Sequence, residues 1–125
     1  MQEQGAIRSF RDLHVWKLAF ELTTAIYRAT AGMPDHERFG MVSQMRRAAV
    51  SVVSNIAEGN GRAHRAQYLH HLTIAFGSLC ELESQLLVSA ELGYLPESAS
   101  KQLLRDLANT GRLLRALQRS LRKST

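Results

Sequence analysis

Residues 41–58 read MVSQMRRAAVSVVSNIAE, and their apolar side chains recur at steps of three and four residues. On a helix, these steps form two neighbouring stripes: Met41, Met45, Ala48, Val52 and Ile56, and beside them Val42, Ala49 and Val53. Because the helix is apolar along two stripes, both stripes must be covered by other parts of the protein. The sequence therefore predicts a helix at about 40–58 that lies at the centre of its domain or against another subunit.

Three further segments carry the same period, at about residues 12–31, 63–92 and 97–122. Glycine and proline separate the four segments: Gly32 with Pro34, then the triplet 59–61, then the stretch 93–96. Ser9 and Asp12 have the spacing of a helix-start box ahead of the first segment. Because no segment has the strict alternation of a strand, we predict an all-α fold. Short joints favour one antiparallel up-down-up-down four-helix bundle over residues 1–125.

The inward positions of these segments are expected to form one core. Its predicted members are Trp16, Phe20, Val52, Ile56, Leu72, Phe76, Leu79, Leu107 and Leu114. Cys80 falls on the inner side of the third segment, where an inert core thiol is expected. Gly77 and Gly111 each cost a helix about 1 kcal/mol relative to alanine, so close packing is expected around them. Gly59 and Gly61 tolerate a positive φ, which allows a tight reversal.

Composition limits what 125 residues can form. A hydrophobic share of 45% is enough for one core, and a single cysteine excludes an internal disulfide and a cysteine-based zinc finger. No apolar run reaches the roughly 20 residues that a membrane span needs, and the first residues lack the pattern of a signal peptide. We expect a soluble, cytoplasmic protein that does not bind a membrane.

The net charge of +5 arises at the C-terminal end of the sequence. Residues 1–96 hold nine basic and nine acidic residues, whereas residues 97–125 hold seven basic and two acidic ones. Five arginines of the fourth segment fall within an arc of about 100°, opposite its leucines: Arg105, Arg112, Arg115, Arg119 and Arg122. With Arg62 and Arg65 near the second joint, they are candidate nucleic-acid-binding residues, because a guanidinium group suits phosphate oxygens. The alternative is a solvated helix face, and this segment has no aromatic residue on which a base could stack.

A second set of polar residues lies in the two central segments: Arg46, Arg47, Asn55, Glu58, Glu81 and Glu83. Adjacent helical residues point about 100° apart, so one of Arg46 and Arg47 faces inward and the other outward. Which of them is buried stays open. We expect a structural network in which the inward arginine pairs with a glutamate and Asn55 adds hydrogen bonds. The outward arginine is a further candidate for phosphate binding.

Metal and catalytic chemistry have little support in the sequence. Di-iron bundles need a Glu-x-x-His motif on two helices, and no glutamate here has a histidine three residues later. His70 and His71 are adjacent and diverge, whereas His64 fits a basic loop with its arginine neighbours. The residues 59–62 lack the lysine and the preceding strand of a phosphate-binding loop. We therefore expect no metal, no cofactor and no enzymatic activity.

Five motifs in order resemble the family of four-helix-bundle proteins encoded in 23S ribosomal RNA intervening sequences. They are FRDLHVW at 10–16, QMRRAA at 44–49, SNIAEG at 54–59, AFGSL at 75–79 with ELE at 81–83, and LGYL at 92–95. The family is also similar to accessory bundle proteins of diversity-generating retroelements, which form pentameric barrels and associate with nucleic acid and a reverse transcriptase. One position departs: residues 51–54 read SVVS where the family pattern has Ser-Ile-Pro-Ser, so a proline kink is not expected.

The resemblance implies a homo-oligomer, a pentamer by that analogy, which binds RNA or DNA and works with a nucleic-acid-processing protein. It implies no established catalysis. A nucleic-acid-associated oligomer is therefore the first functional hypothesis, and an oligomeric scaffold for protein–protein interaction is the alternative. Nuclease treatment distinguishes the two, because a scaffold keeps its protein partner when nucleic acid is removed.

Overall fold

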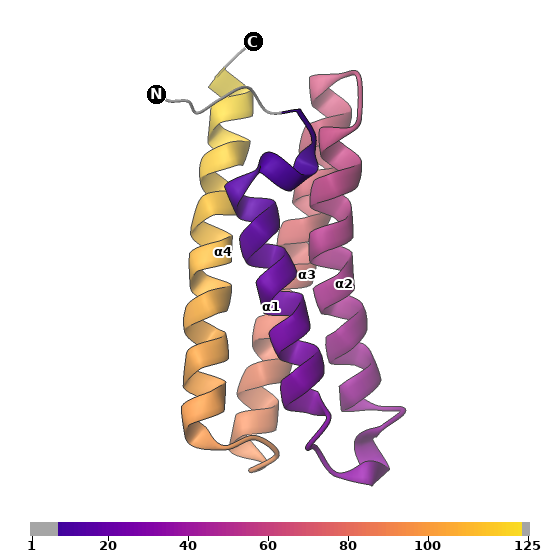
Figure 1. Cartoon of the computed structure of the whole chain (residues 1–125), viewed down its shortest axis with the longest axis vertical. Coiled ribbons are helices and arrows are strands. Elements are labelled where there is room, and N and C mark those ends of the chain that lie inside the picture. Colours follow the sequence, from indigo (N-terminus) through magenta and orange to yellow (C-terminus); the bar gives the residue numbers. More distant parts are fainter. Residues whose placement is uncertain (1–7, 124–125) are drawn as a thin grey trace.

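A computed structural model describes residues 8–123 of the chain. Its long helices are α1 (His14–Thr30), α2 (Met41–Asn60), α3 (Arg65–Glu91) and α4 (Glu97–Lys123). Two short 3-10 helices, η1 (Phe10–Asp12) and η2 (Asp35–Glu37), precede α1 and α2. The long helices alternate in direction along the chain (Figure 1), so the predicted all-α four-helix bundle is confirmed for the described residues. Each helix bound lies within two residues of its predicted position.

Helix α2 is covered from two sides within the chain, by α1 and by α3. Both of its apolar stripes contribute buried side chains: Val42, Met45, Ala48, Ala49, Val52 and Ile56. On the α1 side, the Thr23 hydroxyl donates a hydrogen bond to the carbonyl oxygen of Ala49 at 3.2 Å. Of the two predicted positions for this helix, the structure therefore shows the central one. The helix runs from Met41 to Asn60 without interruption, as expected from the missing proline.

The predicted core is confirmed on α2 and α4 and at Leu72 and Leu79 of α3, but it is wrong for part of α1. Phe20 is 42% exposed and stacks on the half-buried Trp16, with 5.3 Å between ring centroids. The buried stripe of α1 is instead Val15, Ala19, Leu22 and Ile26, rotated by one residue from the predicted one. The small side chain of Ala19 on that stripe permits close approach to α2, whereas the larger rings of Trp16 and Phe20 are only partly covered or exposed.

Two other expectations about α3 are also wrong. Phe76 is half-buried instead of fully buried. The thiol of Cys80, expected in the core, is exposed. The buried stripe passes through Leu72, Leu79 and Leu86. Cys80 follows Leu79 directly, so its side chain points about 100° away from this stripe. The chain's single cysteine is therefore accessible to reagents.

Gly59 does not form the predicted positive-φ turn, because α2 continues through it to Asn60. Its role is close packing: a Cβ added here would lie 2.9 Å from the Cβ of His71 and 3.2 Å from the Tyr68 carbonyl oxygen. Among residues 8–123, positive φ is confined to Gly93, at 73°. There α3 ends in a Schellman motif, in which the N–H of Tyr94 donates to the carbonyl of Ser89 at 2.9 Å.

The expected close packing is confirmed at Gly111 but wrong at Gly77. An added Cβ at Gly111 would lie 3.2 Å from a Leu79 methyl group, whereas at Gly77 it would meet no atom within 4 Å. We therefore expect Gly77→Ala to raise the free energy of unfolding by about 0.5–1 kcal/mol, through helix propensity alone. Urea denaturation measures this change. A lower midpoint would contradict the open surroundings of this position.

Glu37 joins η2, α2 and the α3–α4 joint. One carboxylate oxygen accepts the N–H of Met41 at 3.0 Å, at the start of α2, and the other accepts the Tyr94 hydroxyl at 2.8 Å. The Met41 bond, and next the Tyr94 bond, lower the pKa of Glu37 from its ordinary value of 4.5. The same contact with Glu37 raises the pKa of Tyr94 above 10.0.

These pKa shifts predict how stability depends on pH. The contribution of Glu37 is present above pH 4.5 and is lost as the pH falls through its lower folded pKa, whereas that of Tyr94 is lost as the pH rises above 10.0. We expect Glu37→Gln to have a smaller loss of melting temperature on acidification than the wild type. Thermal melts across the acid range measure it, and parallel curves would contradict it.

Candidate nucleic-acid interface

Helix α4 separates its charges from its buried side chains. Leu103, Leu107, Thr110 and Leu114 face the core, whereas Arg105, Arg112 and Arg119 are exposed at intervals of seven residues. Seven residues are nearly two full turns, so these three arginines, here called the arginine row, form one line along the helix. Arg105 donates to the Gln102 side-chain oxygen at 2.8 Å and Arg112 to that of Asn109 at 3.1 Å. Neutral amides orient these two guanidinium groups and leave their positive charge available to an anion.

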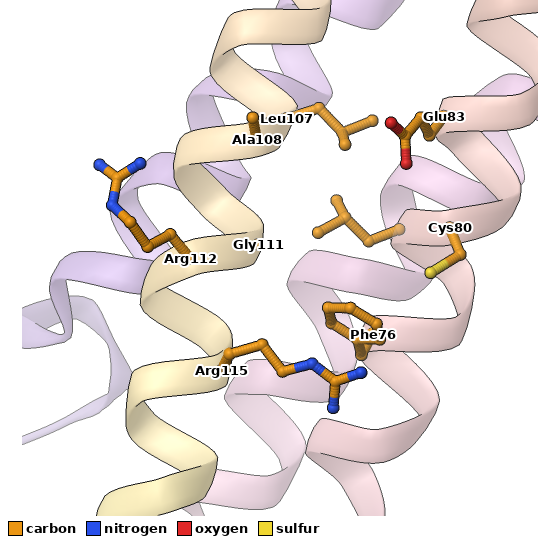
Figure 2. A pocket seen from close by; sticks show the side chains of 9 residues that line it. Phe76, Cys80, Glu83, Leu107, Ala108, Gly111, Arg112 and Arg115 are labelled. Atoms are coloured by element: carbon orange, nitrogen blue, oxygen red, sulfur yellow. The ribbon is translucent and has the colours of Figure 1, made fainter.

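Arg115 points in another direction from the arginine row. Figure 2 shows Arg112 directed away from α3 and Arg115 directed toward it. The guanidinium carbon of Arg115 lies 3.4 Å from the ring centroid of Phe76 on α3, and one of its nitrogens donates to Gln118 at 3.2 Å. The predicted single stripe is therefore two surfaces: the row on one side, and Arg115 on an aromatic ring on the other.

A groove of about 440 Å³ lies between α3 and α4 beside Arg115 (Figure 2). Its lining is mostly apolar, and its small α4 residues are Ala108 and Gly111. The complete lining is Phe76, Leu79, Cys80, Glu83, Leu107, Ala108, Gly111, Arg112 and Arg115. Glu83 stands roughly 10 Å along α3 from Phe76, since seven residues rise 1.5 Å each. The groove thus has a carboxylate toward one end and a guanidinium group toward the other.

The end of the bundle that holds the α2–α3 joint is basic. The antiparallel order brings Arg62 and Arg65 to the same end as the last turn of α4 (Figure 1). We call this region the basic end; its charged residues are Arg8, Arg11, Arg62, Arg65, Arg119, Arg122 and Lys123, with Asp12 and Glu58 as the acidic ones. Glu58 pairs with Arg62 at 3.2 Å, and Asp12 lies 3.9 Å from Arg8.

The opposite end of the bundle is close to neutral. Its acidic side chains are Asp35, Glu37, Glu91 and Glu97, and its basic ones are Arg28, Arg38 and Lys101. Lys101 pairs with Glu97 at 3.1 Å on the first turn of α4. The bundle is therefore polarised along its length. Of the seven predicted binding residues, the fold brings four to the basic end: Arg62, Arg65, Arg119 and Arg122. Arg105 is far from this end, because it lies roughly 25 Å along α4 from Arg122.

Comparison with known proteins gives the family. The family model described as "23S rRNA-intervening sequence protein" matches residues 11–116. The chain belongs to this family. A solved structure from the S23 ribosomal protein family of Bacteroides thetaiotaomicron, a protein described as having unknown function, matches with a TM-score of 0.78 at 22% identity. The match covers 84% of this chain and 95% of that one, and it supports the shared fold. No curated protein matches the sequence.

In this member of the 23S rRNA-intervening sequence family, the inward arginine is Arg46 and the exposed one is Arg47. Arg46 does not bind a glutamate as expected. It donates to the Thr30 hydroxyl at 2.9 Å and to the Tyr27 carbonyl at 3.1 Å, and its guanidinium carbon lies 4.6 Å from the centroid of the Tyr27 ring. The reason is the α1–α2 hairpin, which places Arg46 beside the last turn of α1, where unpaired carbonyls attract a cation.

The expected network of Arg46, Asn55 and glutamates is therefore not assembled. Asn55 pairs across the α2–α3 seam with the Nδ1 atom of His71 at 2.9 Å. Close to it, the Ser51 and Ser78 hydroxyls form a hydrogen bond of 2.8 Å. Sequence reasoning missed His71, Ser51 and Ser78 because each finds its partner on the other helix. Together with Gly59, Asn55 gives the SNIAEG motif of the family a structural role on the α3 side of α2.

The three glutamates lie apart from Arg46. Glu58 pairs with Arg62, Glu81 accepts from the Gln85 amide at 3.3 Å, and Glu83 lines the groove. All three are exposed.

Among residues 8–123, no group of three or more histidine, cysteine, aspartate or glutamate side chains is arranged to hold a metal ion. None of the helices so described is long and apolar enough to cross a membrane.

Proposed function

We propose that this protein is a non-enzymatic, homo-oligomeric bundle that binds the phosphate backbone of RNA or DNA through the arginine row and the basic end. The polarisation of the bundle carries the proposal. Arginines from the α2–α3 joint and from the last turn of α4 share one end, where two carboxylates accompany them, whereas four of the ten carboxylates of residues 8–123 stand at the other end. Such a field attracts a polyanion to one part of the molecule.

Binding of this kind has a defined salt dependence. Contacts with phosphate position a backbone without reading its bases, so affinity is broad in sequence. With about four phosphate contacts, affinity falls about 100-fold between 50 and 200 mM salt. Fluorescence anisotropy with labelled RNA and DNA of several sequences measures this. If no oligonucleotide binds at about 50 mM salt, where such contacts are strongest, the proposal fails.

The apolar stripes of α2 do not support an oligomer, because both are covered within the chain by α1 and α3. The proposal of an oligomer therefore has another basis. Its support is exposed apolar surface elsewhere on the bundle: Phe20, Tyr27, Phe39, Ile74, Leu87, Val88 and Leu92. Phe39, between η2 and α2, is 88% exposed. Apolar side chains that gather on one surface are typical of association sites, and Leu87, Val88 and Leu92 lie close together at the end of α3.

Sedimentation at micromolar concentration tests the oligomer. We expect a mass of several times 14.0 kDa, and five times this value if the pentamer analogy holds. A mass of one chain would contradict the oligomer.

The same exposed apolar residues favour a second candidate, a scaffold for a protein partner such as a nucleic-acid-processing protein. Pull-down with and without nuclease separates the two candidates. Partners that are lost on nuclease treatment support the nucleic-acid proposal, whereas a protein that is retained supports the scaffold.

A further inference from the structure

We infer that the groove between α3 and α4 takes an unstacked base of a single-stranded nucleic acid, seated beside the Arg115–Phe76 pair. This inference rests on the proposed function and makes it more specific, because a duplex keeps its bases stacked and paired. The juxtaposition that carries it is an apolar groove flanked by exposed arginines on one of its two helices.

The Arg115–Phe76 pair supplies the stacking platform. Phe76 and Gln118 hold the guanidinium group of Arg115 in place, at 3.4 Å from the ring centroid and 3.2 Å from the amide oxygen. Aromatic rings and guanidinium planes are the surfaces on which proteins stack unpaired bases. Because Arg115 is already oriented, little side-chain entropy is lost when a base stacks on it.

The groove has room for a planar apolar group. Its volume of about 440 Å³ lies in the range of small-ligand sites. On the α4 side, Ala108 and Gly111 contribute no side chain longer than a methyl group, so this wall of the groove leaves room for a ligand (Figure 2). Apolar walls favour a base over a sugar or a phosphate, since a phosphate buried there would lose its hydration.

Charge then orients the strand. Glu83 repels a phosphate from its end of the groove, whereas Arg112 and Arg115 attract one at the α4 side. Arg112 points away from the groove (Figure 2), where it continues the arginine row toward Arg119. A strand can therefore follow the row with its phosphates and turn a base toward the groove. Glu83 favours bases that offer an amino donor.

Two substitutions test the inference without changing any charge: one fills the groove and the other removes the aromatic ring of the platform. Ala108→Leu adds bulk at an exposed position of α4, and Phe76→Leu removes the ring but keeps an apolar side chain. We expect each to weaken single-strand binding by about 10-fold, within the 5- to 150-fold range of one lost base stack, and to leave duplex binding unchanged. RNA and DNA of the same sequence form the two single-strand arms. Ala31→Leu, the same change at an exposed site outside the groove, is the matched control.

Cys80 offers an independent readout, because it is the chain's single cysteine, is exposed and lines the groove. A saturating single strand should slow its alkylation by maleimide at least about 10-fold, whereas a saturating duplex should not. Circular dichroism and the melting temperature show whether each variant is folded. The alkylation of the wild type keeps the test valid even where a variant does not fold.

The outcomes distinguish this inference from the proposed function. If the wild type binds nucleic acid but groove filling and Cys80 protection have no effect, the groove inference is overturned and backbone binding stands. If the wild type binds no nucleic acid at low salt, the proposed function fails and the inference fails with it. If Cys80 is protected in concentrated protein alone and becomes reactive on dilution, a second copy of the chain covers the groove, which also overturns the inference.

Discussion

Ile56→Ala is expected to lower the free energy of unfolding by about 2–5 kcal/mol. The side chain of Ile56 is 0% exposed and sits on α2, the helix that α1 and α3 cover from two sides. Truncation removes its buried methyl and methylene groups and leaves a cavity that α2, fixed between its neighbours, fills only in part. Urea denaturation at constant protein concentration measures the change.

Ile74→Ala is the matched control, since it removes the same atoms from a side chain that is 40% exposed on α3. Its effect should stay within about 0.5 kcal/mol. Equal losses for the two variants would contradict the central position of α2. A large loss for Ile74 alone would place that side chain in a contact that a single chain does not contain.

The sequence limited α2 to two positions, the centre of the domain or a contact with another subunit, because its two apolar stripes are wider than one contact needs. The orientation of α1 could not be inferred from the sequence. Its segment offers two stripes one residue apart, and the larger side chains, Trp16 and Phe20, suggested the wrong one. The buried stripe contains Ala19, whose small size lets the helices approach closely. Period and hydrophobicity alone do not contain this information, because it depends on the surface that α2 presents.

Part of the candidate site could likewise be predicted from the sequence and part could not. The spacing of the arginines on α4 follows from helix geometry alone, and all five are exposed as expected, but the predicted single stripe is wrong because Arg115 lies on a separate surface from the arginine row. The contact between Arg115 and Phe76 depends on the register of the α3–α4 hairpin, as does the approach of Leu79 to Gly111. A count outward from the joint near residue 95 places these pairs opposite each other, which is the sequence signal that could have identified the platform.

Arg46 illustrates a different limit of sequence reasoning. The expectation of a glutamate partner assumed that a half-buried cation needs an anion. Its partners are the Thr30 hydroxyl and the Tyr27 carbonyl, neutral groups at a helix C-terminus that carries a partial negative charge. Backbone partners of this kind leave no signature in residue type.

Replacing the arginine row by glutamine, at Arg105, Arg112 and Arg119, is expected to weaken nucleic-acid binding about 100-fold at 0.1 M salt. Each phosphate contact adds about 0.7 to the slope of log affinity against log salt for a single strand, so three lost contacts flatten the slope by about 2. All three side chains are exposed, and Arg105 and Arg112 bond to neutral amides of their own helix. The melting temperature should therefore change little.

The control must remove the same charge from another part of the bundle. Arg28, Arg38 and Lys101 are exposed and lie outside the arginine row and the basic end, so their replacement by glutamine lowers the net charge equally. If position matters, this control keeps most of the salt slope while the row variant loses it. Contacts at fixed positions are lost only when the side chains that make them are replaced, whereas a diffuse field depends on the total charge. Equal losses of affinity and salt slope in the two variants would therefore mean that net charge alone attracts the polyanion.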